Sequence, residues 1–84
     1  MRSAKEVQHI LINLYCRTFG GNHDELEVWD DHGDNYMAMR KEDGWVLKIS
    51  IKIVDQYLPG DRSIRKKGKT QLISLFHNFE PPSD

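Results

Sequence analysis

The stretch "GWVLKISIKIV", residues 44–54, decides the expected fold because its side chains alternate with a period of two. Apolar residues fill the odd positions, which are Trp45, Leu47, Ile49, Ile51 and Ile53, and polar residues fill the even positions Lys48, Ser50 and Lys52. Alternation of this kind predicts a strand with one buried face. That apolar face needs a covering element, which the rest of the chain has to supply.

The covering element is predicted to be an amphipathic helix over residues 3–18. Ser3 and Glu6 have the spacing of a capping box, in which each side chain satisfies a backbone N–H at the start of a helix. Apolar residues then recur at the spacing of one helical face: Val7, Ile10, Leu11, Leu14 and Tyr15. Gly20 and Gly21 predict the end of this helix, because glycine readily takes the left-handed conformation that closes one.

Two further strands are predicted between this helix and residue 44. "LEVWDD" at 26–31 alternates, with Leu26 and Val28 on one face and the intervening residues on the other. "YMAMRK" at 36–41 is the next strand, and "DHGDN" at 31–35 has the composition of the turn between them.

The turn that follows residue 41 leaves two registers open. A two-residue turn would place Arg40 beside Leu47, against the core. A three-residue turn, with Gly44 left-handed, would instead place Met39 beside Leu47 and Met37 beside Ile49. We favour the three-residue turn, because a slip of one residue exchanges the two faces and only this register keeps the apolar set together.

Residues 69–80, "KTQLISLFHNFE", are predicted to form a fourth strand whose faces are both partly apolar. One face would carry Leu72, Ser74 and Phe76, and the other would carry Ile73, Leu75, His77 and Phe79. Since a single helix covers only one face, we expect Leu72 and Phe76 to be exposed and to meet a partner.

The expected fold class is α+β, in which an N-terminal amphipathic helix packs on a four-stranded antiparallel sheet as a two-layer sandwich. We expect residues 1–80 to form a single small domain, because 84 residues suffice for one core. Two prolines end the last strand, so residues 81–84 are expected to be a frayed tail.

The composition is ordinary for a soluble domain, with 38% apolar and 30% charged residues. No apolar run approaches the roughly 20 residues that span a bilayer, so no membrane contact is expected. Cys16 is the only cysteine, which excludes an internal disulfide and the secreted disulfide-rich class. We therefore expect a cytoplasmic protein.

Charge is distributed unevenly along the chain, although the net charge is only -1. Residues 24–34 contain six carboxylates and no lysine or arginine. The predicted basic loop 61–69 contains five cations: Arg62, Arg65, Lys66, Lys67 and Lys69. Such a cluster can neutralise phosphates, so a nucleic-acid-binding module that uses this loop is the alternative hypothesis. Nucleic-acid binding is the second choice, because the acidic stretch would repel phosphates and the net charge of the chain is close to zero.

Motifs for a nucleotide, a metal ion or catalysis fail on their spacing. The "GKT" at 68–70 resembles the end of a phosphate-binding loop, but Ser63 stands where that loop needs a glycine. A calcium loop that began at Asp30 would need glycine and glutamate where Asn35 and Lys41 stand. No paired nucleophile and base can be assembled, so we expect no cofactor, no metal and no enzymatic activity.

Trp29 is the leading candidate for a binding residue. It points away from Leu26 and Val28, and hence away from the face that the helix covers, unless the strand is turned over and Trp29 belongs to the core. An exposed tryptophan beside carboxylates is typical of an interface that meets basic side chains. The predicted protein-binding residues are Trp29, Glu27, Asp30, Asp31, Leu72 and Phe76.

These features favour a small regulatory, adaptor or inhibitor protein that acts by binding another protein. A homodimer, formed through an edge strand or through the uncovered sheet face, is one version of this hypothesis. Nothing in the sequence identifies the partner.

Overall fold

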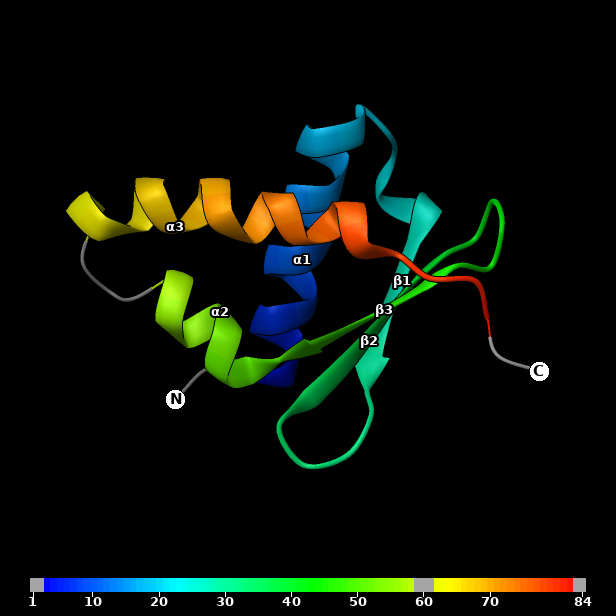
Figure 1. The fold of residues 1–84 in the computed structure, drawn as a ribbon, viewed down its shortest axis with the longest axis horizontal. Coiled ribbons are helices and arrows are strands. Elements are labelled where there is room, and N and C mark those ends of the chain that lie inside the picture. Colours follow the sequence, from blue (N-terminus) through cyan, green and yellow to red (C-terminus); the bar gives the residue numbers. More distant parts are fainter. Residues whose placement is uncertain (1–2, 59–61, 83–84) are drawn as a thin grey trace.

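The computed structural model describes residues 3–58 and 62–82. In chain order the elements are α1 (Ala4–Phe19), the 3-10 helix η1 (His23–Glu25), β1 (Leu26–Asp30), β2 (Asn35–Arg40), β3 (Val46–Ser50), α2 (Ile51–Tyr57), α3 (Arg62–Leu75) and the 3-10 helix η2 (Phe76–Asn78). In Figure 1, α1 runs behind the sheet, α3 crosses α1, and α2 lies below α3. The α+β class with an N-terminal helix is confirmed, but the described strands form a sheet of three, in the antiparallel order β1-β2-β3.

Helix α1 forms as the sequence predicts. The Ser3 hydroxyl accepts a hydrogen bond from the Glu6 N–H at 3.2 Å. Gly20 ends the helix with a left-handed φ of 69°, and its N–H donates to the Cys16 carbonyl at 2.7 Å. The predicted apolar stripe faces the core, where four of its members are buried: Val7, Leu11, Leu14 and Tyr15.

The predicted pairing of the second and third strands is wrong by one residue. Ala38 lies opposite Leu47, and Tyr36 lies opposite Ile49, so Met37 and Met39 fall on the other face. The connection is a four-residue loop, residues 41–44, which closes with Gly44 at the expected left-handed φ of 74°. A three-residue turn would have placed Met37 and Met39 on the core face, whereas the four-residue loop places Tyr36 and Ala38 there.

Arg40 explains why this register is stable. In the four-residue loop Arg40 pairs with Trp45 instead of Leu47, so it lies at the end of the sheet. Its guanidinium carbon is 5.2 Å from the Trp45 ring centroid and 4.7 Å from that of Phe79, and one guanidinium nitrogen is 2.7 Å from the Asp43 carboxylate. Partial desolvation acts to raise the pKa of Asp43, but hydrogen bonds from the Trp45 N–H and from Arg40 outweigh it and lower that pKa.

The third strand is shorter than predicted, because the chain turns into α2 at Ile51. Ser50 caps this helix, and its hydroxyl accepts a hydrogen bond from the Lys52 N–H at 3.1 Å. Ile51, Val54 and Leu58 are buried at helical spacing. The prediction of a strand over residues 51–54 is therefore wrong, because the serine cap takes precedence over the alternating pattern.

The predicted fourth strand is also wrong, because residues 62–75 form α3. Leu72 and Phe76, four residues apart, are 0% and 1% exposed, and Phe79 continues the same apolar stripe. If the segment were a strand, its apolar residues would fall on both faces. In a helix, which has a period of 3.6 residues, the same apolar residues fall on one side. Within the described residues, pairing of this segment with the sheet is limited to one bridge, between Val46 and Glu80.

At Gly68 the backbone of α3 lies against the end of α2. A Cβ atom added at Gly68 would overlap the backbone carbonyl group of Tyr57. Gly68 is also buried, as expected for a helix crossing that only a residue without a side chain permits. The glycine of the "GKT" stretch therefore has a packing role.

Candidate functional site

One face of the sheet is turned away from α1 and from the core. It carries side chains that remain partly open to solvent. Its residues, which we call the outer face, are Glu27, Trp29, Asp31, Met37, Met39, Val46 and Lys48. Trp29 is 37% exposed, and Met37, Met39 and Val46 are half-buried. Figure 1 shows this side of β2 and β3 in front of α1.

The strand register makes the outer face continuous. Trp29 lies opposite Met37, which lies opposite Lys48 across the next pair of strands. In the neighbouring row, Met39 lies between Glu27 and Val46. Because directly opposite side chains on a sheet are in contact range, the apolar groups form one patch with charged groups at its rim.

Three of the predicted binding residues lie together on the outer face, namely Glu27, Trp29 and Asp31. The Asp31 carboxylate is 3.7 Å from the Lys48 ammonium group, which reaches across β2. Asp30, by contrast, belongs to the opposite side of β1. Burial, and then the nearby carboxylates of Asp30 and others, raise the pKa of Tyr36 on that side.

Met37, Met39 and Val46 were not predicted to belong to a binding surface. The favoured register placed both methionines in the core, so they were assigned to the wrong face. The four-residue stretch "KEDG" at 41–44 was the available signal, because a loop of that length reverses the assignment.

Leu72 and Phe76 do not lie on a surface. Leu72 is 0% exposed, and the Phe76 ring packs edge-on against Tyr15, with 5.9 Å between centroids. The expectation that these two residues are exposed toward a partner is wrong, because the segment is a helix whose apolar stripe completes the core.

The free edge of β3 carries backbone groups that point away from β2. The Arg40 N–H donates to the Trp45 carbonyl, and the Ile51 N–H donates to the Asp34 carbonyl, so odd-numbered residues of this strand face β2. Even-numbered residues therefore turn their N–H and C=O outward. Val46 uses both of these groups with Glu80, at 2.9 Å each, whereas those of Lys48 have no partner among the described residues.

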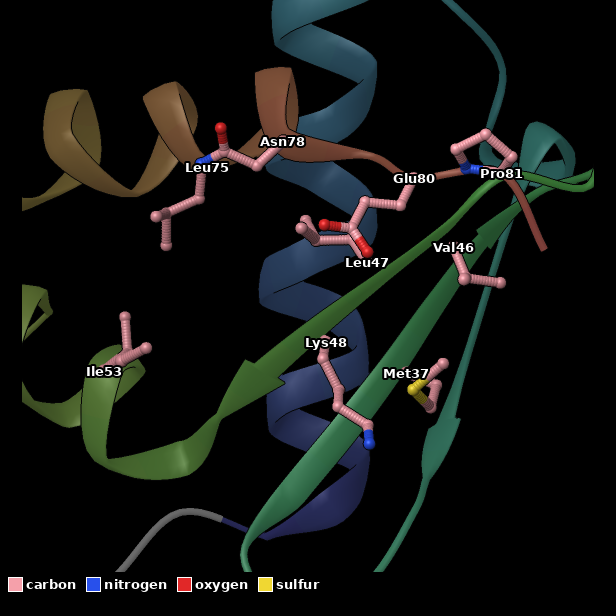
Figure 2. A pocket seen from close by; sticks show the side chains of 9 residues that line it. All are labelled: Met37, Val46, Leu47, Lys48, Ile53, Leu75, Asn78, Glu80 and Pro81. Carbon is pink, nitrogen blue, oxygen red and sulfur yellow. The ribbon is translucent and has the colours of Figure 1, made fainter. Parts of the chain in front are cut away.

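A groove of about 460 Å³ lies along this edge (Figure 2). Ile53 of α2 and Leu75 of α3 form its apolar wall, and Leu47 lies beneath it. Figure 2 shows the Glu80 carboxylate directed toward Leu47, into the groove, and the Lys48 ammonium group directed away from it. The groove thus combines an apolar wall, one carboxylate and the outward backbone groups of Lys48.

The cations of the alternative hypothesis lie on α3, so the expected basic loop is helical from residue 62 onward. Lys66 and Lys67 are exposed, and Lys69 is half-buried in a hollow that Arg17 of α1 also lines. The side chains of Arg62 and Arg65 lie outside the described part of the chain. Within that part, Lys66, Lys67 and Lys69 form no ion pair with a carboxylate.

Histidine, cysteine and acidic side chains are the remaining candidates for metal binding. In the ranges 3–58 and 62–82, no three histidine, cysteine or acidic side chains are grouped to hold a metal ion. His23 is 3.0 Å from the Asn13 side-chain oxygen, and Cys16 is half-buried. None of the described helices has the length and apolar character needed to cross a bilayer.

Comparisons with protein-family models, with curated proteins and with solved structures gave no match for this chain. The geometry of the outer face and of the adjoining groove is therefore the basis for assigning a function.

Proposed function

We propose that this chain is a small regulatory, adaptor or inhibitor protein that binds another protein through the outer face of its sheet. The observation that carries the proposal is the patch formed by Trp29, Met37, Met39 and Val46, four large apolar side chains that are exposed or only half-buried. A contiguous apolar patch on a small domain is typical of an interaction site. Tryptophan and methionine are also enriched in protein interfaces.

The rim of the outer face indicates a basic partner. Glu27, Asp31 and the nearby Glu80 are acidic, and Lys48 is the one cation of this set. Opposite charges at the rim of an interface steer the partner and fix its orientation more than they add affinity. The lone cysteine of the chain supports a cytoplasmic location for this complex.

A comparison of two tryptophans tests the proposal. Trp29 and Trp45 are both 37% exposed, but they lie on opposite faces of the sheet. Immobilised wild-type protein should capture a partner from the native source that Trp29→Ala loses and Trp45→Ala retains. Mass spectrometry identifies the captured proteins, and sedimentation of the purified chain detects the homodimeric version. Capture that is equal for wild type and Trp29→Ala would refute the proposal.

A second candidate function, nucleic-acid binding by α3, rests on the charge of that helix. Its sequence "RSIRKKGKTQLISL" contains five basic residues and no acidic one. On this alternative, wild-type protein binds DNA or RNA with an affinity that falls steeply as salt rises. The double variant Lys66→Glu, Lys67→Glu should abolish that binding in a filter or fluorescence assay. Absence of salt-dependent binding would exclude this candidate and leave the first one unaffected.

A further inference from the structure

We propose that the groove beside β3 accepts an extended, basic segment of the partner protein, which adds to the sheet as a strand opposite Lys48. This inference rests on the proposed protein-binding function and specifies the form of the partner. Strand addition is an established mode of peptide recognition, in which backbone hydrogen bonds give affinity and side-chain pockets give specificity.

The first observation that supports this inference is which backbone groups along the free edge of β3 are already hydrogen-bonded. Val46 already holds an extended residue of the chain itself, because its N–H and C=O both bond to Glu80 at 2.9 Å. After Val46 the chain no longer follows the edge, because Asn78 belongs to η2 and lies on the far wall of the groove. The outward N–H and C=O of Lys48 are therefore the next pair that an incoming strand would meet.

The second support is the chemistry of the groove. Ile53 and Leu75 offer an apolar wall for one side chain of the segment. Glu80 directs its carboxylate into the same space, and within the described residues it has no ion-pair partner. An apolar residue two positions away from a lysine or arginine matches these two features, because side chains two positions apart lie on the same side of an extended segment. An acidic segment does not match them.

A second copy of this chain fits the edge less well. Symmetric pairing of two β3 strands about Lys48 would set two lysines opposite each other, which is unfavourable on a sheet. The Val46 edge of each copy is also occupied by Glu80, which shortens the pairing that remains. A segment of a different protein therefore suits the groove better.

The probe for this inference is a display library of random ten-residue peptides, panned on the full wild-type chain. We expect enrichment of peptides in which an apolar residue and a lysine or arginine are two positions apart. The best peptide is then synthesised, and its Kd is measured for wild type, Lys48→Pro, Lys48→Ala and Glu80→Gln. Proline at position 48 removes an outward N–H but no hydrogen bond to β2, a location where edge strands tolerate proline.

Lys48→Pro should weaken peptide binding by at least about tenfold, because a backbone hydrogen bond is lost and its partner is left unpaired. Lys48→Ala removes the same side chain from the outer face but keeps the N–H, so it is the reference for Lys48→Pro, which should bind the peptide at least about tenfold more weakly than Lys48→Ala. Glu80→Gln should reduce the preference for basic peptides. As a check that needs no folded variant, the Lys48 amide of the wild-type chain should exchange at least about tenfold more slowly with peptide bound.

Equal affinity of wild type and Lys48→Pro, unchanged exchange at Lys48, or failure to enrich any peptide would overturn strand addition. If Trp29→Ala loses the captured partner while Lys48→Pro keeps it, only the strand fails and the proposed function stands. A wild-type dimer that Lys48→Pro dissociates would assign the groove to a second copy and overturn the proposed occupant.

Discussion

Gly68→Ala should destabilise the protein by about 3 kcal/mol, at the upper end of the usual cost of overpacking. At an exposed position inside a helix, the same change normally stabilises by up to about 1 kcal/mol, because alanine is the better helix former. Here the new methyl group would overlap the Tyr57 carbonyl group, so α2 and α3 have to move apart. For a domain of this size, the melting temperature should fall by roughly 12 to 24 °C.

Gln71→Ala is the matched control for this prediction, because Gln71 is exposed on the same helix. Its effect on the free energy of unfolding should stay within about 0.5 kcal/mol. Urea or thermal denaturation followed by circular dichroism measures both variants. A Gly68→Ala variant as stable as the wild type would contradict the close crossing of α2 and α3.

Phe76→Ala should destabilise the protein by about 3 to 5 kcal/mol, the range observed when a large aromatic side chain is removed from a core. Phe76 is 1% exposed, and its ring lies within 6.5 Å of the ring centroids of Tyr15, Phe19 and Phe79. Truncation leaves a cavity among these rings, because rigid aromatic neighbours collapse only partly.

Phe19→Ala is the control for the aromatic cluster. Phe19 packs on Tyr15 at 4.8 Å between centroids but is 42% exposed, so its removal should cost clearly less stability than Phe76→Ala in the same urea titration. If Phe76→Ala retained full stability and instead lost the partner, Phe76 would belong to the contact surface, as the strand assignment had predicted.

The start of the fold was predictable because its local signals agree with one another. In α1 the Ser3 cap, the apolar stripe and Gly20 all indicate the same helix. β1 and β2 were also predictable, since the polar turn between them separates two short alternating runs. Trp29 was placed on the correct face for the same reason.

The second half of the fold was mispredicted in the segments where a strand-like alternation and a helical spacing are both present. Ile51 and Ile53 continue the alternation of β3, yet Ser50 is a good helix cap, and the buried spacing of Ile51, Val54 and Leu58 is helical. In residues 69–80 a helical stripe was interpreted as a strand with two apolar faces. Periodicity alone does not separate these cases over a few residues.

The outer face was predicted only in part, because its membership depends on the length of one loop. Adding Lys41 to the loop exchanges Met37 and Met39 for Tyr36 and Ala38 in the core. The groove beside β3 could not be predicted at all. Its wall is formed by α2 and α3, and the sequence patterns had predicted strands in these two segments.

The affinity of the captured partner for matched tryptophan variants tests the central claim most directly. Trp29→Ala should raise the Kd by roughly 30-fold or more, the effect of an interface hot spot worth about 2 kcal/mol. Trp45→Ala, with the same exposed fraction on the other face, should change the Kd by less than about threefold. An equal loss in the two variants, or a loss confined to Trp45→Ala, would contradict binding through the outer face.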